Sequence, residues 1–226
     1  MPMAIPEPQL PPGFPCSQTF LLPGPAGVLE LLTACPDESK AVPGTAVICH
    51  PHPLQGGTMH NKVVHTLARS FGELGLRTVR FNFRGIGASA GHFDHGRGET
   101  KDALAVLSWV RAQRPDDDIW LAGFSFGGYV AANAAHSFAV KQLVTVAPAV
   151  HLYSFASIKV PPAPWLVIQG DADDVVAPQA VVDWAARMHP PPQLEMLKGV
   201  DHFFHGRLHD LRAVLHEQLV RQRPRA

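Results

Sequence analysis

The segment 119–130 carries the residues of this chain that best fit nucleophilic chemistry. It starts as an apolar run, passes through Gly123-x-Ser125-x-Gly127 and continues into an alanine-rich stretch that is typical of a helix. A serine at such a strand-to-helix turn has strained backbone, so nearby residues must be small. Gly123 and Gly127 meet this need, because a side chain at either position would crowd the turn. The serine oxygen would then lie at the positive end of the helix, where developing negative charge is stabilised.

A serine hydroxyl becomes an effective nucleophile when a base takes its proton and an acid holds that base in the right tautomer. Three carboxylates, Asp171, Asp173 and Asp174, follow an apolar run at 165–169. The chain has 13 histidines, and His202 follows a further apolar segment at 194–198. The alternative interpretation is a glycine-rich turn with an incidental serine and three solvated loop aspartates.

The elements that would position these residues alternate along the chain. Strands are expected at 17–22, 27–33, 45–49, 76–83, 119–124, 143–149, 165–169 and 194–198, and helices at 60–74, 97–114, directly after Ser125, at 178–188 and at 203–221. Strands that alternate with helices predict a mostly parallel sheet with right-handed crossovers. The proline-rich residues 1–16 are expected to form an extended lead-in, and residues 17–226 one domain.

Composition excludes several classes of function. The 226 residues are 46% hydrophobic, and 19 basic residues balance 19 acidic ones, which does not suggest binding to nucleic acid or to an anionic membrane. The N-terminus does not resemble a signal peptide, and no apolar run reaches the length of a membrane span. Cys16, Cys35 and Cys49 are odd in number and widely spaced, so no disulfide framework is expected.

Several motifs resemble those of the α/β-hydrolase family, over residues 17–221. They are the Gly-x-Ser-x-Gly turn, Phe81–Ser89, His50-Pro51-His52-Pro53 and Asp201-His202-Phe203-Phe204. The resemblance implies a mostly parallel sheet of about seven to eight strands flanked by helices. Within the family the chain is similar to small bacterial hydrolases related to dienelactone hydrolases and short acyl esterases. Dienelactone hydrolases proper use a cysteine nucleophile, so Ser125 departs from them and favours ordinary ester chemistry.

The resemblance also implies the order of the catalytic residues, with the nucleophile first, then the acid and then the base. Ser125 is accordingly the expected nucleophile and His202 the expected base. In this family the acid usually lies three residues after the glycine that ends the preceding strand, and this position is Asp173. Asp174 is the alternative acid, and Asp171 is expected to order the loop.

An oxyanion that forms during acyl transfer needs backbone N–H groups aimed at it. Phe126, the residue after the nucleophile, is expected to supply one of them. The second is expected from the loop after residue 49, where Pro51 and Pro53 cannot donate. This leaves His52 as the expected donor and Leu54 as the alternative. The family's usual glycine in this loop is replaced by Pro51.

Members of the family with a lid insert it before the strand that starts at Trp165, and here only residues 150–164 are available. This length is too short for a helical cap, so no cap domain and an open or shallow site are expected. Leu54, Phe124 and Tyr153 are expected to bind the substrate as part of an apolar acyl pocket.

Two other kinds of site fit the sequence less well. Gly85 to Gly91 has one residue too many for a dinucleotide-binding Gly-x-Gly-x-x-Gly motif, and no helical segment follows it directly. The histidine pairs lack the spacing of known zinc motifs. We therefore expect neither a cofactor nor a metal ion.

The sequence predicts a serine hydrolase that cleaves small to medium carboxylic esters or thioesters through an acyl-enzyme on Ser125. An acyltransferase or a small peptidase with the same three residues is an alternative, and a non-catalytic ligand-binding protein of the same fold is another. The expected partner is a small-molecule acyl substrate, with no nucleic acid and no membrane. The chain is expected to be cytoplasmic and a monomer or homodimer.

Overall fold

The computed structural model describes residues 10–11, 13–155, 158–220 and 222, so most of the predicted lead-in at 1–16 lies outside the described residues. In the described part, eight strands form one sheet in the order β1-β2-β4-β3-β5-β6-β7-β8. They are β1 (Thr19–Gly24), β2 (Gly27–Ala34), β3 (Gly44–Cys49), β4 (Arg77–Phe81), β5 (Asp118–Phe124), β6 (Gln142–Val146), β7 (Trp165–Gly170) and β8 (Gln193–Leu197). Only the pairs β1–β2 and β2–β4 are antiparallel, so the predicted mostly parallel sheet is confirmed.

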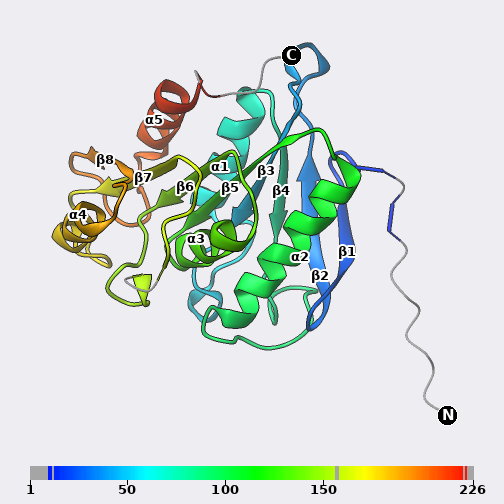
Figure 1. Ribbon diagram of the computed structural model, residues 1–226, viewed down its shortest axis with the longest axis horizontal. Coiled ribbons are helices and arrows are strands. Elements are labelled where there is room, and N and C mark those ends of the chain that lie inside the picture. The colour runs from blue at the N-terminus through cyan, green and yellow to red at the C-terminus, as the bar shows by residue number, and fades with distance from the viewer. Residues whose placement is uncertain (1–9, 12, 156–157, 221, 223–226) are drawn as a thin grey trace.

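Helices cover both faces of the sheet (Figure 1). They are α1 (Lys62–Glu73), α2 (Arg97–Gln113), α3 (Phe126–Ser137), α4 (Pro178–Arg187) and α5 (Leu208–Leu219), with short 3-10 turns η1 (Glu38–Lys40) and η2 (Pro53–Gln55). In β3, Val47 and Cys49 pack toward α2 and α3, whereas Ala46 and Ile48 pack toward α1 and α5. Because successive side chains point to opposite faces, a strand covered on both sides must be apolar throughout.

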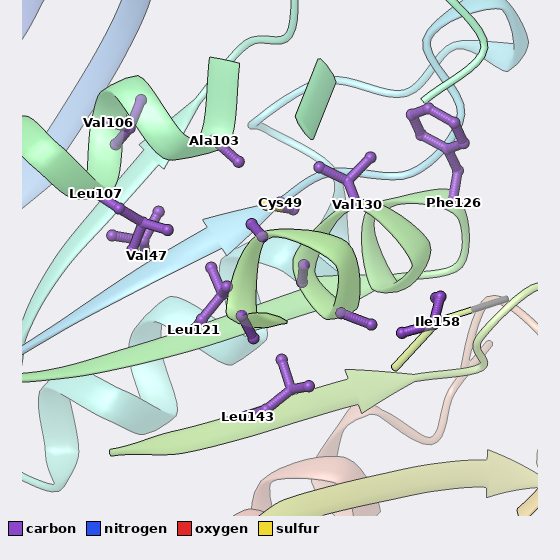
Figure 2. Close-up of a cluster of buried hydrophobic side chains, with 14 of the residues drawn as sticks. Val47, Cys49, Ala103, Val106, Leu107, Leu121, Phe126, Val130, Leu143 and Ile158 are labelled. Carbon is purple, nitrogen blue, oxygen red and sulfur yellow. The ribbon is translucent and has the colours of Figure 1, made fainter. Parts of the chain in front are cut away.

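The helix α3 packs on the middle of the sheet, which places its first residue beside the ends of several strands. Figure 2 shows Leu121 and Leu143 beneath this helix and Val130 on it, all part of one buried apolar cluster. The strands β3 and β5 to β8 are parallel, so their carboxyl ends meet at one edge of the sheet. The loops that follow β3, β5, β7 and β8 therefore gather at that edge.

The last helix is shorter than predicted. The sequence favours a helix over 203–221, but α5 begins at Leu208. Phe204 and Gly206 have φ angles of 57° and 67°, and backbone with positive φ cannot continue a right-handed helix. The apolar residues after His202 therefore lie in a turn beside the site, and the first part of the predicted helix is wrong.

The prediction that the cysteines form no disulfide framework is also wrong. Cys16 and Cys35 are joined by a disulfide with a Cα–Cα distance of 5.3 Å, and Cys49 is a buried free thiol. The number of cysteines is odd because the chain has one bonded pair and one free cysteine in the core. Disulfides persist mainly in oxidising compartments, and the cytoplasmic location stays a prediction. None of the helices in the described part of the chain has the length and apolar character needed to cross a bilayer.

We expect reduction of the Cys16–Cys35 bond to lower the free energy of unfolding by about 3 kcal/mol, because it releases a closed loop of about twenty residues. For a chain of this size, such a loss lowers the melting temperature by roughly 6–12 °C. Thermal melts with and without dithiothreitol measure the shift. The double variant Cys16→Ser/Cys35→Ser is the control, since its melting temperature should not respond to the reductant. An equal response in both proteins would contradict the assignment.

Candidate active site

Ser125 lies at the sharp turn between β5 and α3 and is nearly buried. Its φ and ψ are 53° and −116°, a conformation that is rare outside glycine. Its N–H donates to the Val146 carbonyl at 2.9 Å, which ties the turn to β6. A Cβ at Gly123 would lie 2.1 Å from the Gly127 carbonyl oxygen, and one at Gly127 would lie 2.3 Å from the Cys49 carbonyl oxygen. Only glycine fits at these two positions, which explains the spacing of the motif.

His202 lies in the loop after β8 and contacts both other members of the predicted catalytic set. Its Nε2 is 3.2 Å from Ser125 Oγ, and its Nδ1 is 2.8 Å from Asp173 Oδ2. A carboxylate only accepts hydrogen bonds, so Nδ1 carries the proton and Nε2 is left to accept from the serine hydroxyl. This is the arrangement in which a histidine can remove a proton from serine.

Asp173 is buried in the loop after β7 and accepts hydrogen bonds from four groups. Its Oδ2 accepts from His202 and from Gln169 Nε2 at 2.9 Å, and its Oδ1 accepts from the amides of Val175 and Val176 at 2.9 and 2.7 Å. Burial alone would raise the pKa of Asp173, but the hydrogen bonds from His202, Val176 and Gln169 together lower it. The carboxylate therefore stays ionised at neutral pH.

The two neighbouring aspartates do not take part in this arrangement. Asp171 Oδ1 accepts a hydrogen bond from the Gly199 amide, so it ties the loop after β7 to the loop after β8, as expected. Asp174 is exposed at the surface. Of the three carboxylates in the loop, the structure brings Asp173 to His202.

The amides of Phe126 and His52 are both free to bind a ligand. Phe126 is the first residue of α3, and within the described residues no hydrogen bond occupies either amide. The alternative donor Leu54 is already engaged, because its N–H donates to His52 Nδ1 at 3.1 Å. The sequence leaves His52 and Leu54 as candidate donors from this loop, and only His52 has a free N–H.

His50 fixes the orientation of the His52 amide, a role that the sequence alone did not reveal. His50 Nε2 accepts from the Phe83 amide at 3.0 Å, so Nδ1 carries the proton and donates to the Pro51 carbonyl at 2.7 Å. That carbonyl shares its peptide plane with the His52 N–H, which points the opposite way across a trans peptide. Burial lowers the pKa of His50 to about 3, against the opposing effect of the Pro51 hydrogen bond, so the ring is neutral.

A cavity of about 350 Å³ opens in front of Ser125. Its lining combines the loop after β3, the start of α3, the segment after β6, and the loops after β7 and β8. Apolar side chains provide much of the wall: Phe126, Ala149, Leu152, Tyr153, Val175 and Phe203. The segment 147–164 between β6 and β7 lies at one side of the cavity, and its described residues form only short turns.

Two of the three predicted substrate-binding residues lie elsewhere. Leu54 is on η2, is 71% exposed and does not line the cavity. Phe124 is fully buried, because strand alternation points it to the face of α1 and α5, where its ring packs beneath His202 with a centroid distance of 5.1 Å. Tyr153 does line the cavity, together with the adjacent Leu152, which was not among the predicted substrate-binding residues.

Comparison with known proteins identifies the family of this chain. A family model described as serine aminopeptidase, S33, matches residues 44–162, just over half of the chain. The chain belongs to this family and thus to the α/β-hydrolase superfamily of serine hydrolases.

Three relatives match along most of their length. A solved structure from Xanthomonas campestris, described as an α/β serine hydrolase without lid, is 47% identical, covers 96% of this chain and 100% of that one, and has a TM-score of 0.92. An α/β serine hydrolase homologue from Coxiella burnetii is 48% identical, with coverage of 91% and 99% and a TM-score of 0.88. An uncharacterized protein of Rickettsia prowazekii is 32% identical over 185 residues, with coverage of 77% and 78%.

Proposed function

We propose that this hydrolase cleaves small to medium carboxylic esters or thioesters through an acyl-enzyme on Ser125. The observation that carries the proposal is the continuous hydrogen-bond chain from Ser125 through His202 to Asp173 at the base of an open, largely apolar cavity. Such a chain activates a serine for attack on a carbonyl carbon. The surrounding wall fits an acyl group better than a charged one.

The reaction has two halves. Ser125 Oγ attacks the carbonyl carbon while His202 Nε2 takes the hydroxyl proton, and the protonated ring then gives that proton to the departing alcohol or thiol. Water next attacks the acyl carbon, and His202 again first takes and then returns a proton. Asp173 holds the ring in position and stabilises its positive charge.

The oxyanion of each tetrahedral intermediate lies between the amides of Phe126 and His52 in this proposal. Both residues line the cavity, and neither amide has a hydrogen-bond partner within the described residues. Donors that are held in place before the reaction stabilise the developing charge without reorganisation. His50 supplies this rigidity for His52, because it holds the Pro51 carbonyl on the opposite side of the same peptide.

The lining of the cavity also favours ester or thioester hydrolysis over the aminopeptidase and acyltransferase alternatives. An aminopeptidase must bind a free terminal ammonium group, for which a carboxylate is the natural partner, yet none of the described residues lining this cavity is aspartate or glutamate. An acyltransferase needs to keep water from the acyl-enzyme, and this cavity is bordered by short turns. We therefore favour hydrolysis of esters or thioesters over both.

A fluorophosphonate probe tests the proposal directly, since it phosphonylates only an activated serine. We expect an adduct on the peptide that contains Ser125, located by mass spectrometry, and none in Ser125→Ala. A panel of esters and thioesters of two to eight acyl carbons then reports on the substrate. Absence of both the adduct and turnover in folded protein would refute the proposal and favour a ligand-binding protein of this fold.

A further inference from the structure

A second hollow adjoins the catalytic cavity. It measures about 490 Å³ and shares three wall residues, Gly56, Asn61 and Phe203, with the cavity in front of Ser125. Its remaining wall comes from the start of α1 and from the turn before α5. The two spaces therefore lie side by side, and we call them the two arms of the site.

The position of His202 indicates which part of the substrate the second arm would bind. His202 must protonate the leaving oxygen or sulfur, so the leaving group lies on the histidine side of Ser125. The second hollow is on that side, because the residues that directly follow His202 line it, namely Phe203, Phe204 and His205. If the proposed function holds, the apolar arm takes the acyl group and the second hollow takes the alcohol or thiol part.

The titratable side chains that line this second hollow are all basic. Its lining contains Lys62, His60 and His205 but, among the described residues, no carboxylate. His205 is paired with Asp201 at 2.8 Å, so Lys62 and His60 remain as the groups able to attract an anion. A cleft lined by charges of one sign raises the local concentration of ligands of the opposite sign.

Lys62 has no stabilising role that would account for its charge. It is the first residue of α1, whose first turn contains no acidic residue, and a cation at a helix N-terminus opposes the helix dipole. No ion pair joins Lys62 to a carboxylate in the part of the chain that the structure describes. Its ammonium group is thus available to a ligand.

Further basic residues lie on and beside α1, outside this arm. Burial lowers the pKa of His65, and the nearby charges of Arg80, Arg69 and His60 lower it further. Arg69 is paired with Glu73, but Arg80 donates to the Met59 carbonyl rather than to a carboxylate. These residues line a separate hollow that also contains Asp37 and Glu73, so within the second arm the basic groups are Lys62 and His60.

We propose that this arm binds an anionic group on the leaving part of the substrate, so that the preferred substrates are esters or thioesters whose alcohol or thiol carries a phosphate or a carboxylate. Lys62 would be the main specificity-determining residue, and His60 would assist it. Because the arm is open to solvent, the contribution is moderate and is weakened by salt.

Matched butyryl esters of glycerol, glycerol 3-phosphate, glyceric acid and choline test the proposal. We expect kcat/KM to be highest for an anionic ester and lowest for the choline ester at low ionic strength. The phosphate and carboxylate esters show which anion is preferred. Lys62→Met should lower kcat/KM about fivefold for the anionic esters only, mainly through KM, and Lys62→Glu should lower it further. Neither variant should lower the melting temperature, because both remove a cation from a helix N-terminus.

Lys141→Glu is the matched control for net charge. Lys141 is exposed and directly precedes β6, at the edge of the sheet opposite the carboxyl ends that hold the site. If the four esters are cleaved equally, or if Lys62→Glu and Lys141→Glu behave alike, the anionic subsite is refuted while the esterase proposal stands. If no ester is cleaved and Ser125 is not labelled, the proposed function fails first and the subsite falls with it.

Discussion

Asp173→Asn is expected to lower kcat by about 10⁴, whereas Asp174→Asn should leave it unchanged. An asparagine amide in place of Asp173 Oδ2 would donate to His202 Nδ1 and so place the ring proton on Nε2. A protonated Nε2 cannot accept the proton of Ser125, although the fold and the cavity are kept. Asp174 is exposed and serves as the neighbouring control in the same loop.

Steady-state kinetics on one ester measures this effect, and Ser125→Ala, with an expected loss of about 10⁶, sets the floor. Melting temperatures confirm that each variant is folded. Similar losses in the two aspartate variants would indicate a general disturbance of the loop. A loss only in Asp174→Asn would mean that the acid is assigned to the wrong residue.

A pair of His50 variants is expected to differ in kcat by about 10² to 10³, the cost of losing one oxyanion donor. The amide of asparagine lies where His50 Nδ1 lies, so His50→Asn should still donate to the Pro51 carbonyl and retain most activity. The side-chain amide of glutamine instead reaches the place of Nε2, where its oxygen can accept from the Phe83 amide. His50→Gln should therefore keep the bond to Phe83 but release the peptide that carries the His52 N–H. The loss should appear in kcat rather than in KM.

If His50 had a purely structural role, both variants would lose activity in proportion to their loss of stability. Measuring kcat and the melting temperature of each variant distinguishes the two cases. Acid titration gives a second readout. The pKa of His50 is about 3 in the fold and near its ordinary value of 6.5 when unfolded. Its contribution is therefore complete above pH 6.5 and is lost as the pH falls toward 3. Both variants should show a shallower loss of unfolding free energy over this range.

Local sequence patterns predicted the elements near the serine well, because their constraints are local. The turn at Ser125 needs two glycines, a buried strand before it and a small-residue helix after it, and all of these are adjacent in the chain. The start of α5 could not be predicted in the same way. Phe204 adopts positive φ in a turn that closes against the site, and its apolar side chain resembles helix core in the sequence.

The sequence could predict where side chains at strand ends lie, but not where side chains lie whose direction depends on packing. His202 and Asp173 follow parallel strands, so topology alone brings them to Ser125. Phe124 is also next to Ser125 in sequence but points to the other face of the sheet. His50 acts through the backbone of its neighbour, which no residue pattern displays. Cys16 and Cys35 flank the β1–β2 hairpin, and its antiparallel register brings them opposite each other.

The short turns between β6 and β7 have a consequence for kinetics at lipid interfaces. A site that must first be uncovered responds to an interface, because the surface stabilises the uncovered form. With only residues 147–164 in that segment, the cavity needs no such step. Turnover of a sparingly soluble ester should therefore follow the concentration of dissolved monomer and level off, rather than jump, once the substrate begins to form micelles.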